Sequence, residues 1–205
     1  MFTGIIEETG VIRQCRRQGG KYILSVECRI VCETDDSVAV NGICLTVTDT
    51  RDGMITFHAV DETAARTTLP SWSAGIPVNL ERGMPASGRF DGHMVQGHID
   101  GTATLKAVYR KEDNAEMSFS CRRELTDLMV EKGSVAINGV SLTIKSVSAS
   151  GFSVALIPYT LENTTLNNVK PGQPVNVEMD IIGKYIRKFL TESKGLEEKI
   201  KQWGY

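Results

Sequence analysis

Short runs that alternate apolar and polar residues recur along the chain. In the first half they are rich in Val, Ile and Thr and are separated by Gly, Asp, Asn or Pro. They cover residues 22–26, 37–40, 43–48, 54–60 and 78–81, and the second half repeats them at 115–121, 134–137, 140–147, 152–157 and 175–179. The pattern predicts an all-β protein of small antiparallel barrels, because a lone sheet of this size must close its edges. Three further segments are predicted as short helices at the barrel ends: Glu62–Leu69, Glu124–Lys132 and Leu161–Leu166.

The sequence itself is duplicated. Residues 37–47 return as residues 134–144, 97 positions later, with seven of the eleven residues identical. The same shift, or one of 93 near the start, carries three further blocks onto later copies: Met1–Ile6, Thr67–Leu69 and Pro77–Glu81. A period this long excludes a solenoid or a propeller blade. Two equivalent domains imply two equivalent sites, which favours chemistry on two similar molecules.

The end of the chain has no counterpart in the first half. Residues 83–92 are rich in Gly, Pro, Ser and Asp and predict a linker, so the barrels are assigned to residues 1–92 and 93–180. In the tail, 181–205, an apolar stripe of helical period predicts a helix: Ile181, Ile182, Tyr185, Ile186, Phe189 and Leu190. This helix packs either on its own barrels or on helices of other subunits, and the second interpretation is favoured because the stripe is both aromatic and aliphatic.

Composition and charge disfavour several classes of protein. The net charge is −2 with no basic strip, which disfavours nucleic acid as a partner. No signal peptide and no apolar run long enough for a membrane span is present. The five cysteines are irregularly spaced, and the Cys28/Cys32 pair has no nearby His, so neither a disulfide framework nor a metal site is expected and a cytoplasmic location fits best.

The strand after each Asn-Gly pair carries the candidate chemistry. Alternation places Cys44 and Thr46 on the face away from the first core, and Ser141 and Thr143 on the same face of the second. A solvated strand face explains the hydroxyls, but an exposed cysteine is less easily explained in that way. His98 replaces Ile5 of the first copy, and is either a core histidine or a proton-transfer group. A His93–His98 metal pair is discounted, and His58 is interpreted as structural or as part of a ligand wall.

These motifs resemble the riboflavin synthase family of the α-chain type. The resemblance rests on Met1–Glu7, on Asn41–Val47 with its copy Asn138–Ile144, and on Gly92–Gly101. It implies two tandem homologous six-stranded barrels plus a C-terminal α-helix that joins a homotrimer. The implied reaction is a dismutation: two 6,7-dimethyl-8-ribityllumazine molecules in one active site exchange a four-carbon unit without metal or cofactor. The products would be riboflavin and 5-amino-6-ribitylaminouracil. The active site would lie between the first barrel of one subunit and the second barrel of its neighbour.

The resemblance also implies site residues. Those tied to activity are Phe2, Ser37, Cys44, His98, Ser141, Thr143 and Asp180. A first-barrel pocket is expected to comprise Gly4, Ile5, Ile6, Cys44, Leu45, Thr46, His58, Ala59, Val60, Asp61, Glu62 and Thr63. A second-barrel pocket is expected to comprise Gly97, His98, Ile99, Lys132, Ser141, Leu142, Thr143, Ala155, Leu156, Ile157, Pro158, Tyr159 and Thr160. We hypothesise that His98, Ser141 and Thr143 handle protons at one ring, and that Cys44 contacts the other as nucleophile or as pocket wall.

One residue departs from the family pattern. Asn138 stands where the second copy usually has Asp, which removes a carboxylate next to Ser141 and puts charge-assisted activation of that hydroxyl in doubt. The alternative function is a non-catalytic protein that only binds a lumazine or flavin. Which barrel holds donor or acceptor, and whether lumazine synthase is a partner, stay open.

Overall fold

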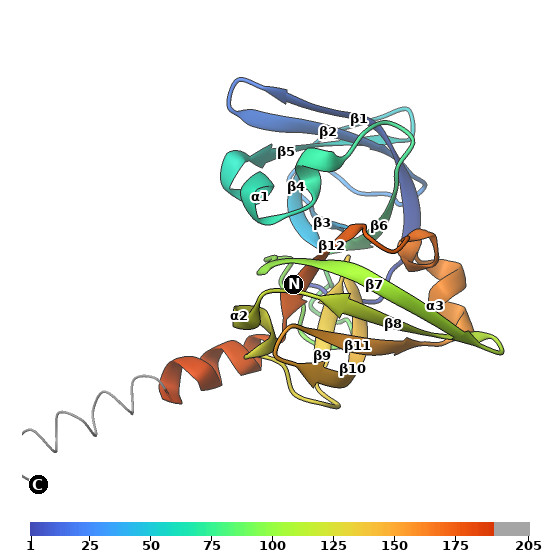
Figure 1. Cartoon of the computed structure of the whole chain (residues 1–205). Helices are drawn as coiled ribbons and strands as arrows, with labels where there is room; N and C mark the ends of the chain where they lie inside the picture. Colours follow the sequence, from blue (N-terminus) through green and yellow to red (C-terminus); the bar gives the residue numbers. More distant parts are fainter. Residues whose placement is uncertain (191–205) are drawn as a thin grey trace, which may run out of the picture.

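A computed structural model describes residues 1–190, which contain two closed six-stranded antiparallel barrels stacked one on the other (Figure 1). The first barrel runs in the order β1-β2-β5-β4-β3-β6, and the second repeats it as β7-β8-β11-β10-β9-β12. This confirms the predicted fold class. The first-barrel strands are β1 (Glu8–Gln18), β2 (Lys21–Glu27), β3 (Ser37–Val40), β4 (Ile43–Arg51), β5 (Met54–Val60) and β6 (Pro77–Arg82). Those of the second are β7 (Gly101–Lys111), β8 (Asn114–Ser120), β9 (Ser134–Ile137), β10 (Val140–Ser148), β11 (Gly151–Leu156) and β12 (Pro174–Met179).

The first strand of each barrel escapes the sequence pattern. β1 and β7 are the longest strands, 11 residues each, yet neither shows sustained alternation. Both carry a register shift, between Ile12 and Gln14 in β1 and between Leu105 and Ala107 in β7. Such a bulge moves the following side chains to the other face and interrupts the apolar period. The outer end of each strand is also largely exposed and carries polar residues.

Short helices close the barrel ends, as expected, but with other limits. They are α1 (Asp61–Arg66), η1 (Leu69–Ser71), α2 (Arg123–Thr126), α3 (Pro158–Asn163) and η2 (Thr165–Asn168). The helix expected over Glu124–Lys132 is therefore reduced to one turn. Thr126 donates its hydroxyl to the carbonyl of Arg123, and Lys132 has a left-handed φ of 68° that ends helical geometry before it.

The barrels meet across an approximate two-fold axis. The Asn41-Gly42 turn before β4 and the Asn138-Gly139 turn before β10 both have positive φ, as a two-residue hairpin turn requires. A Cβ on Gly42 would lie 2.7 Å from the backbone nitrogen of Gly139, so the two turns pack directly on each other. The duplicated Asn-Gly pair thus forms both the hairpins and the contact between barrels.

The segments that precede β1 and β7 cross between the barrels. Phe2 and Val95 form an antiparallel bridge, with N–H···O distances of 2.7 and 3.1 Å. Beyond it, Ile6 packs against the core of the second barrel, whereas Ile99 is buried in the core of the first. Each domain therefore contributes its leading segment to the other.

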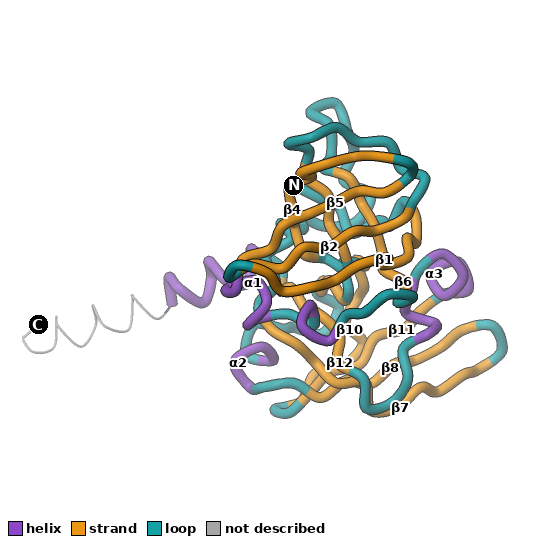
Figure 2. The backbone as a smooth tube through the Cα atoms, turned by 90° about the horizontal axis from the view of Figure 1, so that it is seen from above, coloured by secondary structure: helices purple, strands orange, loops and turns teal. Residues whose placement is uncertain are grey.

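Residues 181–190 form a helix that extends away from both barrels (Figures 1 and 2). The apolar stripe is exposed by more than half at Ile182, Tyr185, Ile186, Phe189 and Leu190. The helix therefore does not bury its stripe on its own barrels. The rest of the predicted tail, 191–205, lies outside the described residues. Among the residues described, no helix is long and apolar enough to cross a membrane.

Candidate functional site

The strand faces that carry the candidate chemistry lie as predicted. In β4, Ile43, Leu45 and Val47 are buried while Cys44 is half-buried and Thr46 exposed. In β10 the same alternation leaves Ser141 half-buried and Thr143 exposed. Each barrel thus presents a nucleophile-type side chain outside its core.

The leading segment of each domain lies beside the candidate side chain of the other copy. These exchanged segments are Gly4–Ile6 and Gly97–Ile99. The carbonyl of Gly97 accepts the N–H of Cys44 at 2.9 Å, and the carbonyl of Gly4 accepts the N–H of Ser141 at 2.8 Å. Both glycines have positive φ, 80° and 77°. A Cβ there would stand 2.4 Å from Cβ of Cys44 and 2.6 Å from Cβ of Ser141. Only glycine allows this approach.

This geometry corrects the grouping expected from the sequence. Within one chain, Gly97–Ile99 lie with Cys44, and Gly4–Ile6 lie with Ser141, the reverse of the expected pairing. The cause is the Phe2–Val95 bridge, which directs each leading segment onto the other barrel. His98 therefore joins the Cys44 pocket.

Two buried carboxylates anchor the exchanged segments. Glu81 accepts the N–H groups of Thr3 and Gly4 at 2.6 and 3.0 Å, and Glu178 accepts those of Gln96 and Gly97 at 2.7 and 2.9 Å. Burial raises the pKa of Glu178 to about 7, against the opposing effect of the backbone hydrogen bonds, and also raises the pKa of Glu81. The Val-Asn-x-Glu repeat thus fixes the strands that approach Cys44 and Ser141.

A pocket of about 470 Å³ opens beside Cys44. Its wall includes Thr63 and Arg66 of α1, His98 of the exchanged segment, and Lys184 of the C-terminal helix. Lys184 Nζ pairs with Asp100 Oδ2 at 2.6 Å, which holds the helix against this pocket. Sequence reasoning missed Arg66 and Lys184, because the repeat offers no matching cation and the tail was interpreted only as an assembly helix.

The surroundings of Cys44 raise the pKa of its thiol. Burial raises the pKa of its thiol, and a hydrogen bond with Ser37 lowers it by less. Phe2 is fully buried and belongs to a small cluster that Cys44 packs against. Phe2 thus packs near Cys44, and the roles in activity that the resemblance implies for Phe2 and Ser37 stay predictions.

Ser141 has a different partner. Its Oγ lies 2.7 Å from Nδ1 of His93, a residue that the sequence suggests only as half of a discounted metal pair. Burial lowers the pKa of His93, and the carboxylate of Asp180 raises it by less. Asp180 itself accepts the N–H of Ile182 at 3.0 Å at the start of the C-terminal helix. His93 has no counterpart in the first copy of the repeat, so only the fold reveals its contact with Ser141.

Other expected residues lie less directly at these two centres. His58 is exposed on β5, 3.3 Å from the Lys21 ammonium. Lys132 is exposed in the turn before β9. In the second barrel, Ala155 is the exposed residue before the end of β11, and Thr160 in α3 is the repeat counterpart of Thr63.

Comparison with known proteins gives the family. The sequence family described as lumazine binding domain matches the chain twice, over residues 3–83 and 96–180. The curated riboflavin synthase of Bacillus subtilis (strain 168) is 42% identical over 205 residues, covering 98% of this chain and 94% of the relative. The chain belongs to the riboflavin synthase family. The riboflavin synthase of Actinobacillus pleuropneumoniae is 41% identical over 202 residues, covering 97% of this chain and 94% of the relative.

Solved structures agree on the fold. The crystal structure of LumP complexed with riboflavin has a TM-score of 0.79 at 26% identity, covering 87% of this chain and 99% of that chain. LumP complexed with 6,7-dimethyl-8-(1'-D-ribityl) lumazine gives 0.78 at 24% identity over the same shares. The chain is thus clearly more similar in sequence to riboflavin synthases than to LumP.

Proposed function

We propose that the chain binds two molecules of 6,7-dimethyl-8-ribityllumazine and transfers a four-carbon unit between them, the riboflavin synthase reaction. One product is riboflavin and the other is 5-amino-6-ribitylaminouracil. Together they contain all the atoms of two substrate molecules, so no external oxidant or reductant is needed. The observation that carries the proposal is the pair of related but unequal centres, Cys44 with Gly97 and Ser141 with Gly4, in a chain of this family.

Each centre offers backbone and side-chain groups for one ligand. The strand faces that carry Cys44 and Ser141 suit a pteridine ring, and Thr63 and Thr160 suit the ribityl hydroxyls. Holding two rings in reacting orientation can supply about 7–11 kcal/mol of the barrier. The protein then needs only modest bases to remove a proton from the 7-methyl group. We assign such a role to His98, with Cys44 as contact or nucleophile.

The test is product stoichiometry. The purified protein, treated with a chelator, is mixed with 6,7-dimethyl-8-ribityllumazine, and both products are quantified by chromatography. We expect multiple turnovers, one riboflavin for every two lumazines consumed, and an equal amount of the uracil. A tight fluorescent complex without riboflavin would instead establish the non-catalytic alternative, the class of function that LumP structures with bound ligands suggest.

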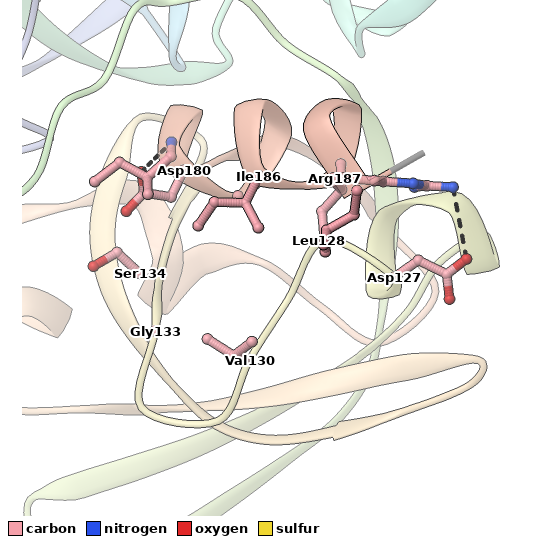
Figure 3. Close-up of a pocket in the computed structure, with 11 residues that line it drawn as sticks. Asp127, Leu128, Val130, Gly133, Ser134, Asp180, Ile186 and Arg187 are labelled. Atoms are coloured by element: carbon pink, nitrogen blue, oxygen red, sulfur yellow. Dashed lines mark hydrogen bonds and ion pairs between the residues drawn. The ribbon is translucent and has the colours of Figure 1, made fainter. Parts of the chain in front are cut away.

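We also propose that the chain forms a homotrimer through its C-terminal helices. The stripe on helix 181–190 is exposed, and a groove of about 630 Å³ with a mostly apolar wall lies between this helix and the loop after α2 (Figure 3). Ile186 and Val130 face this groove, and an ion pair between Arg187 and Asp127, at 3.8 Å, spans its end. Ile186→Glu should give monomers in light scattering. Val31→Glu, at an apolar residue 78% exposed elsewhere, should leave the trimer intact.

The five cysteines form no disulfide. This supports the cytoplasmic location proposed from the sequence, since reducing compartments keep thiols free.

A further inference from the structure

His93 lies directly over the second-barrel centre. It directly follows the predicted linker and precedes the Phe2–Val95 bridge. Its N–H donates to the carbonyl of Thr3 at 3.1 Å, and its Nδ1 lies 2.7 Å from Oγ of Ser141. The approach is close: a Cβ on Gly92 would stand 2.1 Å from the Thr3 carbonyl oxygen and 3.0 Å from Oγ of Ser141. The backbone thus fixes the imidazole against the serine.

The other ring nitrogen points to a second contact. Nε2 of His93 is buried and has no hydrogen-bond partner among the described residues. Buried polar atoms are nearly always bonded to protein, ligand or ordered water, so this nitrogen marks a place for such a partner. Asp180 is near enough for its carboxylate to act electrostatically on the ring. His93 therefore contacts Ser141 and is influenced by the charge of Asp180, and the family resemblance ties both of these residues to activity.

The first barrel is built differently. Cys44, the counterpart of Ser141, has no such contact with a histidine among the hydrogen bonds of the described residues, although His98 lines the same pocket. Asn138, the residue that casts doubt on activation of Ser141, turns its Oδ1 to the backbone of Asn176. Polarisation of the Ser141 hydroxyl thus has one visible source in the described structure, the His93 ring.

We propose that His93 is a positioning residue of the second-barrel centre: it orients and polarises the Ser141 hydroxyl toward the bound lumazine, with Asp180 supporting the ring. A neutral imidazole has one donor and one acceptor nitrogen. When Nδ1 accepts a hydrogen bond from the Ser141 hydroxyl, Nε2 carries the ring proton. Nε2–H can then donate a hydrogen bond to a water molecule or to a heteroatom of the substrate. The inference rests on the proposed function and deepens it.

The test is a double-mutant cycle on turnover with 6,7-dimethyl-8-ribityllumazine. His93→Phe and Ser141→Ala should each lower kcat by roughly tenfold or more, the loss of one well-placed hydrogen bond. The double variant should be no slower than Ser141→Ala alone, because coupled residues are non-additive. His93→Asn, whose amide can occupy the Nδ1 position, should recover most of the rate. Thermal unfolding of each variant reports whether the fold is kept.

A spectroscopic measurement on the wild-type chain provides an independent readout. The chain has three histidines, so the ¹⁵N signals of the His93 ring can be assigned by single substitutions. Ser141→Ala should shift the Nδ1 signal and leave the other two rings unchanged. Wild-type turnover for His93→Phe, fully additive losses, or an unmoved Nδ1 signal would overturn the inference. Failure of the wild type to form riboflavin would instead count against the proposed function.

Discussion

Oδ1 of Asn138 accepts the backbone N–H of Asn176 at 2.8 Å. The amide of Asn176 in turn donates to the carbonyl of Asn41 in the other barrel at 3.0 Å. Its repeat counterpart, Asn79, donates to the carbonyl of Asn138 at 2.9 Å. Four asparagines thus join the two barrels around the two-fold axis. Asn138 therefore connects the barrels, and its Oδ1 is bonded to Asn176.

This role predicts the effect of restoring the family's usual residue. Asn138→Asp keeps the accepting oxygen, so turnover should stay within about twofold of wild type, well short of a lost hydrogen bond. Asn138→Ala leaves the buried N–H of Asn176 without its acceptor and should lower the free energy of unfolding by about 1–3 kcal/mol. Urea denaturation and steady-state rates measure both effects. A large gain in turnover for Asn138→Asp would mean that the Asp does act on Ser141.

The close approach of Gly97 to Cys44 can be tested with a matched control. Gly97→Ala and Gly20→Ala share the strain of a positive φ, 80° and 76°, but a Cβ at Gly20 meets nothing within 4 Å. Gly97→Ala should be less stable than Gly20→Ala by about 1–3 kcal/mol, the usual cost of overpacking. It should also lose most of its turnover, because Cys44 must move. Equal behaviour of the two variants in thermal unfolding and kinetics would disprove the exchange geometry.

Substitutions of His98 and Cys44 in the Cys44 pocket should lower kcat by different amounts. His98→Gln removes the assigned base and should lower kcat by roughly a hundredfold or more. Cys44→Ser places in the first barrel the residue that the second already uses, so its loss should be below about tenfold, within a modest hydrogen-bond difference. The control is Cys15→Ser, because the Cys15 thiol donates a hydrogen bond to the carbonyl of Leu69 and lies away from the pocket. Its turnover should match that of the wild type. A rate within about twofold of wild type for His98→Gln would remove its role as base, and a loss well above about tenfold for Cys44→Ser would show that a serine cannot replace Cys44.

Burial of Glu178 predicts a pH dependence of stability. Its pKa is raised from 4.5 to about 7, so the folded state favours the protonated form. The stabilisation is fully present below pH 4.5 and is lost as pH rises through 7, on the order of 3 kcal/mol. Glu178→Gln does not titrate, so wild type should lose stability relative to this variant between pH 5 and pH 8. Urea denaturation at one protein concentration measures the difference, and parallel pH curves would refute the raised pKa.

The sequence predicts the parts of this fold that depend on local pattern. The repeat predicts two domains built from strands. Alternation of apolar and polar residues assigns Cys44 and Ser141 to the outer face of their strands, as the structure confirms. β1 and β7 were not predicted, because bulges interrupt their apolar period. The exchanged segments and the His93–Ser141 contact arise from pairing between residues far apart in the chain, which no local spacing encodes.

Subunit complementation tests the central claim, that two unlike pockets from neighbouring chains form each active site. Thr63→Trp should block the Cys44 pocket and Thr160→Trp its counterpart, so either variant alone should make no riboflavin. In trimers assembled from equal amounts of both, about a quarter of the inter-chain sites combine two intact pockets, since the interfaces are heterologous. We predict riboflavin formation at about that share of the wild-type rate. An inactive mixture of correctly assembled trimers, or full activity of either variant alone, would contradict the account.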